Sequence, residues 1–237
     1  MKNNIKSWVC LTAVTVASGL TAQAIPSAPT SAIFYSLNGT TWTAAAYDND
    51  LVDGTSPDTS ATAGIIHTEI TAGGFTLDLI GTHSYPNIGT LASPQMDLGI
   101  AGVTGGPAGA TIYVAFSANG FHPVPGGSFL TTSAPNNSGA DETTSTFVSS
   151  GNDGLNSQDL FVSSTTGGTV SGYPVGLIGN ADGYAITIVD KFVANGKGVR
   201  ISDDDSLAVP DGGNTLMLLG SALSVLGLGV FRKSRKA

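Results

Sequence analysis

The feature of this sequence that most constrains its fold is a two-residue alternation of apolar and polar side chains in short runs. In residues 111–117, Ile112, Val114 and Phe116 alternate with smaller or more polar residues, and residues 75–79 repeat the pattern. Successive side chains of a strand point to opposite faces, so each such run predicts a strand with one buried face. No stretch shows three consecutive turns of the apolar spacing typical of an amphipathic helix. The alternation therefore predicts an all-β chain.

Clusters of Gly, Asn, Asp and Pro separate these runs, for example Asn119-Gly120, Asn152-Asp153-Gly154 and Gly167-Gly168. Such residues supply the tight reversals that antiparallel strands need. Charged residues make up only 11 % of the chain, which argues against a coiled coil or helical bundle. We predict a single antiparallel β-sandwich, jelly-roll-like, over residues 25–208. Its further strands are expected at residues 32–37, 65–71, 95–100, 128–133, 146–149, 160–163, 184–193 and 198–207.

The first 24 residues have the three parts of a secretory signal peptide. Two lysines precede an uncharged stretch of 13 residues, Trp8 to Leu20, and Ala22 and Ala24 provide the small side chains that signal peptidase requires. Thirteen helical residues are too short to cross a hydrocarbon core of about 30 Å, which argues against a permanent anchor. Cleavage is expected after Ala24. The only cysteine, Cys10, would be lost with the signal, so the mature chain would form no disulfide and no thiolate site.

A second apolar segment lies near the C-terminus. Residues 215–231 are 17 residues without a charge, about the minimum for a transmembrane helix. A buried helix of a globular domain would be the alternative, but no face of the segment is polar. Basic residues are expected to stay in the cytoplasm, so the region between the two apolar ends would be exported. The basic cluster that follows the segment directly consists of Arg232, Lys233, Arg235 and Lys236.

The segment before this helix, Val209-Pro210-Asp211-Gly212-Gly213, completes a tripartite pattern over residues 209–237. This order of a short Pro-containing motif, an apolar span and a basic tail resembles the PEP-CTERM sorting signal, in a variant with Val-Pro-Asp. The resemblance implies an exosortase as partner, removal of the tail, and a Gram-negative bacterium that makes an exopolysaccharide. A plain tail-anchored protein is the alternative.

The charge of the exported region limits its partners. Between residues 25 and 209 there are 16 acidic and three basic residues, a net charge of −13. Such a surface repels nucleic acid and anionic lipid, and it either attracts divalent cations or simply tolerates salt. No cofactor is expected, with calcium as the alternative, because carboxylate oxygens are its preferred ligands.

Three acidic segments are candidates for binding a metal ion. Asp48, Asp50 and Asp53 precede Gly54 in a pattern that partly resembles a calcium loop, although Val52 replaces an oxygen ligand. The run 203–205 is three aspartates, a pattern more typical of a solvated linker. His67-Thr68-Glu69 places an imidazole and a carboxylate on one strand face, which either begins a metal site or is a solvent-facing surface.

Carbohydrate binding would need exposed aromatic rings, and Trp42 and Tyr47 are the candidate contacts. Aromatic residues on strands more often pack in the core or across strands. The chain has no Gly-x-Ser-x-Gly elbow and no phosphate-binding loop. These observations predict a non-catalytic exported protein of the cell surface or extracellular matrix, structural or adhesive, associated with exopolysaccharide in a biofilm. The alternative is a carbohydrate-binding protein or a glycan-active hydrolase.

Overall fold

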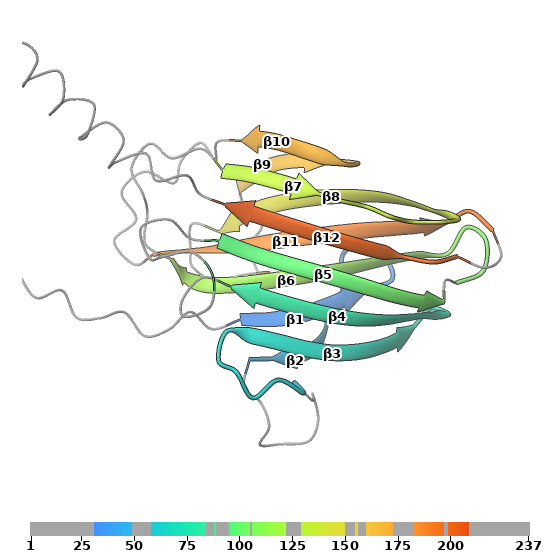
Figure 1. The fold of residues 1–237 in the computed structure, drawn as a ribbon, viewed down its shortest axis with the longest axis horizontal. Helices are drawn as coiled ribbons and strands as arrows, with labels where there is room; N and C mark the ends of the chain where they lie inside the picture. The colour runs from blue at the N-terminus through green and yellow to red at the C-terminus, as the bar shows by residue number, and fades with distance from the viewer. Residues whose placement is uncertain are drawn as a thin grey trace, which may run out of the picture.

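The computed structural model describes residues 31–48, 58–83, 88, 95–104, 106–121, 129–149, 155, 160–172, 183–196 and 199–208. These residues form two antiparallel sheets packed face to face, as Figure 1 shows, which confirms the predicted β-sandwich. The signal peptide and the sorting signal with its predicted helix, residues 215–231, lie outside the described residues. Within the described part of the chain, no helix has the length and hydrophobicity of a membrane span.

The first sheet has six strands in the order β2-β1-β6-β11-β8-β9. Its central pair is formed by the two longest strands, in which Ile188 pairs with Phe116 and both side chains point into the core. The strand bounds are β1 Ser31–Ser36, β2 Thr43–Tyr47, β6 Thr111–Phe121, β8 Ala140–Ser149, β9 Leu160–Thr165 and β11 Tyr184–Ala194.

The second sheet also has six strands, in the order β10-β7-β12-β5-β4-β3. Strands β3 and β4 form a hairpin because Gly73 and Gly74 both take positive φ, at 60° and 85°, as a tight hairpin turn requires. The strand bounds are β3 Ile65–Ala72, β4 Phe75–His83, β5 Gln95–Thr104, β7 Phe129–Ser133, β10 Gly168–Gly172 and β12 Ser202–Ala208.

The predicted turn at Asn119-Gly120 is wrong, because both residues lie within β6. The strand continues through an irregularity in its pairing with β11, where Tyr184 pairs with Phe121 but Ile186 pairs with Ala118. Gly120 takes a φ of 85° at this point. Gly120 therefore has the positive φ that the sequence predicts, but the positive φ belongs to a β-bulge within the strand and not to a turn.

The two ends of the described chain lie at the same end of the sandwich. Ser31, the first residue of β1, pairs with Ala118 near the end of β6, and Ala208, the last residue of β12, pairs with Gln95 at the start of β5. Figure 1 shows β1 beginning and β12 ending on the same side of the molecule. We call this the terminal end. The opposite end, which carries the turn between β1 and β2 and the turn between β3 and β4, is the distal end.

A close contact between the sheets occurs where Gly81 of β4 faces the ring of Phe116 in β6. A Cβ atom at Gly81 would lie 2.9 Å from two ring carbons of Phe116. We expect Gly81→Ala to lower the free energy of unfolding by about 1–3 kcal/mol, because the core must shift to admit the methyl group. Gly99→Ala in β5 is the matched control, since its nearest neighbouring atom is 3.8 Å away. Urea unfolding of both variants tests this, and equal stability of the two would contradict it.

Candidate functional site

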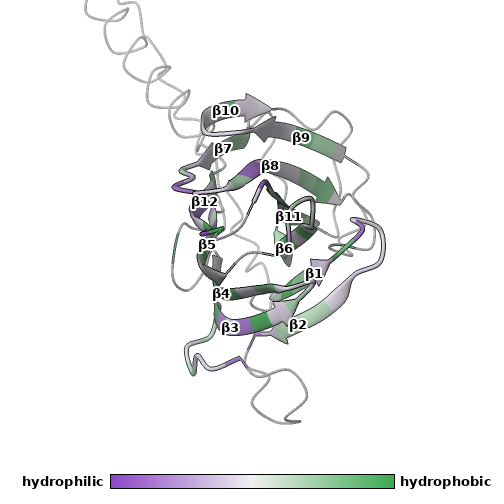
Figure 2. Ribbon diagram, turned by 90° about the vertical axis from the view of Figure 1, so that its right-hand side faces the viewer, coloured by the Kyte–Doolittle hydropathy of each residue, from purple (hydrophilic) through white to green (hydrophobic). Residues whose placement is uncertain are grey.

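The interior of the sandwich has an apolar part and a polar part. Around β3, β4, β5 and β6 the inward side chains are large and apolar, including Phe75, Leu79 and Phe116. Between β7 and β12 of one sheet and β8 and β9 of the other, many buried side chains are polar instead. Figure 2, which looks along the strands, shows hydrophilic colour on both β8 and β12. The buried polar residues of this part are Thr131, Ser133, Glu142, Thr144, Thr146, Ser163, Thr165, Asp190, Asp203 and Asp205.

Four of these residues form a buried carboxylate cluster: Glu142 of β8, Asp190 of β11, and Asp203 and Asp205 of β12. One oxygen from each side chain can be chosen so that the four atoms all lie within 4.8 Å of one another. Asp203 and Asp205 both face inward because residues two apart on a strand share a face. Glu142 and Asp190 come from neighbouring strands of the opposite sheet, where Glu142 pairs with Phe192.

Few hydrogen-bond donors reach the cluster. The Thr144 hydroxyl donates to Oδ2 of Asp205 at 2.9 Å and lies 3.4 Å from Oε1 of Glu142. The Asn137 amide donates to Oε2 of Glu142. Both carboxylate oxygens of Asp190 and of Asp203 have no donor, and neither has Oδ1 of Asp205. Among the described residues, no Lys, Arg or His forms an ion pair with the cluster.

Three carboxyl groups of the cluster, those of Glu142, Asp190 and Asp205, have a raised pKa. Burial raises the pKa of Asp190 to about 8, and the charges of Asp203 and Glu142 also raise it. Burial, followed by interactions with Asp203, raises the pKa of Glu142 to about 9. Burial and the charge of Asp190 raise the pKa of Asp205 strongly as well. The cause is common to all three, because a charge removed from water and set beside like charges is unfavourable.

The run 203–205 is therefore not a solvated linker, which corrects the expectation from the sequence. It lies in β12, where Asp203 and Asp205 are buried and Asp204 is exposed. A signal for the cluster was present in the sequence, since Asp190 interrupts the apolar strand around residues 184–193. What the sequence could not give is the pairing of β11 with β8 and the packing of β12 across the interior.

Of the three aspartates in the predicted calcium loop, Asp48 is the one that lies within the described residues. Asp48 accepts the backbone N–H of Gly64 through Oδ1 at 3.0 Å and through Oδ2 at 2.9 Å. This bond connects the end of β2 to the turn before β3. Asp50 and Asp53 lie outside the described residues.

At the second candidate metal site, His67 contacts an aspartate of the neighbouring strand. His67 Nε2 lies 2.7 Å from Oδ1 of Asp78 on the paired strand β4. Both side chains are partly exposed, at 45 % and 39 %. The pair fits a solvent-facing cross-strand contact on the outer face of the second sheet.

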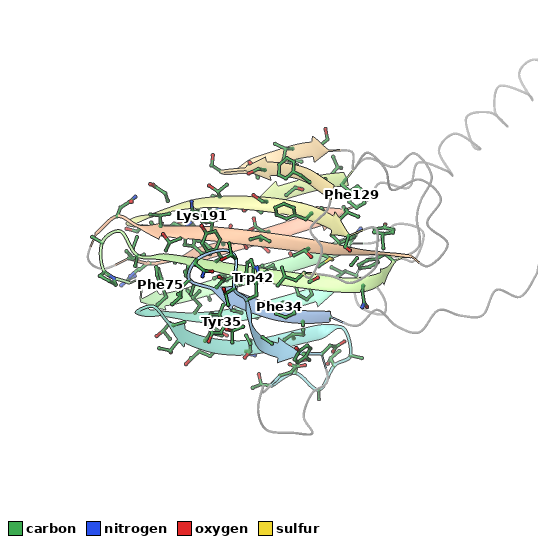
Figure 3. All side chains as sticks on the ribbon, turned by 180° about the vertical axis from the view of Figure 1, so that it is seen from behind. Phe34, Tyr35, Trp42, Phe75, Phe129 and Lys191 are labelled. Carbon is green, nitrogen blue, oxygen red and sulfur yellow. The ribbon has the colours of Figure 1, made fainter. Side chains whose placement is uncertain are left out.

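The two candidate glycan contacts lie at opposite ends of β2. Trp42 precedes the strand at the distal end and packs edge-on against Tyr113, with ring centroids 6.4 Å apart. Tyr47 ends the strand and packs edge-on against Phe34 at 6.3 Å. Lys191, labelled with Trp42 in Figure 3, lies beside the same tyrosine, with its Nζ 5.8 Å from the centroid of the Tyr113 ring. The two rings are five residues apart, roughly 17 Å along a strand, so they do not share one stacking platform.

An open groove of about 460 Å³ lies at the distal end, between the turn after β1 and the turn after β3. The turn after β1 is ordered by its own side chains. Ser36 Oγ accepts the N–H of Gly39 at 2.9 Å, and Asn38 Oδ1 accepts the N–H of Thr41 at 2.8 Å. The groove is lined by Tyr35, Ser36, Leu37, Asn38, Thr41, Thr43, Thr71, Ala72 and Gly73.

The predicted processing sites, Ala22 and Ala24 and the sorting signal of residues 209–213 with its basic tail, lie outside the described residues. Comparison with known proteins finds no family model, no curated protein and no solved structure that matches this chain.

Proposed function

We propose that this chain is an exported, non-catalytic β-sandwich protein of the cell surface or extracellular matrix, sorted by an exosortase and associated with exopolysaccharide. The observation that carries the proposal is that the sandwich begins and ends on the same side. The sandwich begins at Ser31 and ends at Ala208, and both residues lie at its terminal end, next to the segments with the sequence of export and sorting signals. A protein held through this end would project its distal end away from the membrane.

The surface that such a protein displays favours polar contacts. Exposed hydroxyl pairs join neighbouring strands on the outer faces, with Ser145 3.2 Å from Ser164 on the first sheet and Thr132 3.0 Å from Thr169 on the second. Hydroxyl groups both donate and accept hydrogen bonds, so they suit a hydroxyl-rich polymer. The distal groove adds the polar side chains of Asn38 and Thr41 and the ring of Tyr35.

The chain crosses between the two sheets many times, which supports a jelly-roll-like connectivity.

A dedicated carbohydrate-binding protein is the second candidate, and the distal groove favours it because Tyr35 and several polar side chains converge there. A glycan-active hydrolase is less well supported. Its two carboxyl groups must reach the glycosidic bond, whereas the carboxylates of the cluster are buried between the sheets.

The sorting signal is tested by its removal. We expect deletion of residues 209–237 to release the protein into the medium, or to block its maturation, in a host that has an exosortase. Replacing Val209, Pro210 and Asp211 together by alanine should leave a precursor that keeps its tail. Intact mass of the membrane, surface and medium fractions measures both outcomes, and Ser164→Ala on the exposed face of β9 is the control. Unchanged fractionation together with an unchanged tail mass would overturn the proposal.

A further inference from the structure

The buried carboxylate cluster has more acidic groups than nearby positive charges and more oxygens than hydrogen-bond donors. Glu142, Asp190, Asp203 and Asp205 bring together four acidic groups, at most 8 % exposed, from strands of both sheets. A buried carboxylate without donors or counter-charge is strongly unfavourable. Asp190 is 0 % exposed and neither of its oxygens has a donor, and Asp203 likewise has none. One oxygen of each of the four side chains lies within 4.8 Å of the others, so a proton or a cation between them would offset the charge.

The potential metal-ligating atoms of the cluster are all oxygens. Besides the four carboxylates they include the Thr144 hydroxyl, and Ser133 Oγ is also buried and without a partner, at a residue that pairs with Asp205. Oxygen-only sites favour hard cations, whereas zinc and copper prefer nitrogen and sulfur ligands.

The cluster oxygens are close enough together to share one ion, since the four lie within 4.8 Å of one another. Ca²⁺ accepts six to eight oxygen ligands in flexible geometry. Mg²⁺ demands near-ideal octahedral geometry and usually keeps several waters, which a site buried between two sheets accommodates less well.

We propose that Glu142, Asp190, Asp203 and Asp205 form a structural binding site for Ca²⁺ inside the sandwich. The ion connects β8 and β11 of the first sheet to β12 of the second and compensates the charge of the buried carboxylates. This site is distinct from the loop at residues 48–54, and it does not depend on how the protein is sorted. Its consequence is that the domain reaches full stability only where Ca²⁺ is abundant.

The proposal is tested with CaCl2 on the full-length protein, purified in detergent and freed of metal with a chelator. Isothermal titration calorimetry with CaCl2 should give a saturable heat of binding. At about one hundred times the dissociation constant, CaCl2 should raise the melting temperature by roughly 5–10 °C. MgCl2 at the same concentration should raise it less.

The variants separate the site from non-specific binding. Asp190→Asn keeps the shape of the side chain, removes one charge, and is expected to abolish both the saturable heat and the calcium-dependent shift. Asp141→Asn is the matched control, because Asp141 neighbours Glu142 in β8 but is exposed, and it should behave like the wild type. Absence of a shift in the wild type would overturn the proposal, and so would a shift that Asp190→Asn retains. If Asp190→Asn is poorly folded, Asp203→Asn provides the same comparison.

Discussion

In calcium-free buffer, the free energy of unfolding of this protein is expected to fall by several kcal/mol as the pH rises from about 4 to about 8. The pKa of Asp190 rises from 3.8 to about 8 in the folded state, and that of Glu142 rises from 4.5 to about 9. Between the two values the folded state holds protons that the unfolded state has already released. Stability from these groups is therefore complete below about pH 4 and is lost as the pH rises through the folded pKa values.

Three groups of the cluster act in this direction. They are Glu142 from β8, Asp190 from β11 and Asp205 from β12. On the outer face of the second sheet, burial and the charge of Asp204 raise the pKa of Asp97 to about 6, which adds to the same trend.

Urea unfolding between pH 4.5 and pH 8.5 in the presence of a chelator measures this dependence. One pKa unit corresponds to about 1.4 kcal/mol, but relaxation of the cluster will reduce the full effect. Asp190→Asn should flatten the dependence, because the amide does not titrate, and Asp141→Asn should leave it unchanged. Stability that rises between pH 5 and pH 8 without calcium would show that the cluster is not buried as described.

Thr131→Val is expected to lower the free energy of unfolding by about 1–3 kcal/mol. The Thr131 hydroxyl of β7 lies 2.8 Å from Oγ1 of Thr146 and 2.6 Å from Oγ of Ser163. These three hydroxyls connect the second sheet to β8 and β9 of the first. Valine has nearly the same shape as threonine, so the substitution removes the hydrogen bonds and leaves buried hydroxyls without a partner.

Thr132→Val is the matched control for this prediction. Thr132 is the next residue of the same strand, and its exposed hydroxyl lies 3.0 Å from Oγ1 of Thr169. Water can replace that contact, so the change in stability should stay within about 0.5 kcal/mol. Chemical denaturation of both variants measures the difference, and equal losses would indicate that the buried hydroxyl network contributes nothing to joining the sheets.

The sequence alone determined the fold class, because the alternation of side chains along a strand is a local property. Ile112, Val114 and Phe116 alternate in the sequence and point into the core in the structure. The export and sorting signals are also local patterns, and they remain predictions from residues 1–24 and 209–237. Asn119-Gly120 shows the limit of such reasoning, since positive φ serves a bulge as readily as a turn.

Only the tertiary structure decided where the acidic residues lie. The sequence separates Glu142 from Asp205 by 63 positions and offers Asp48, Asp50 and Asp53 as the more compact candidate. Strand order and register then place Asp190 beside Glu142 and pack β12 across from them. A run of aspartates taken alone predicts a solvent-exposed segment, because burial of charge is unfavourable. Whether a partner ion or proton offsets that cost depends on contacts between strands that are distant in the sequence, and the amino-acid order does not reveal those contacts.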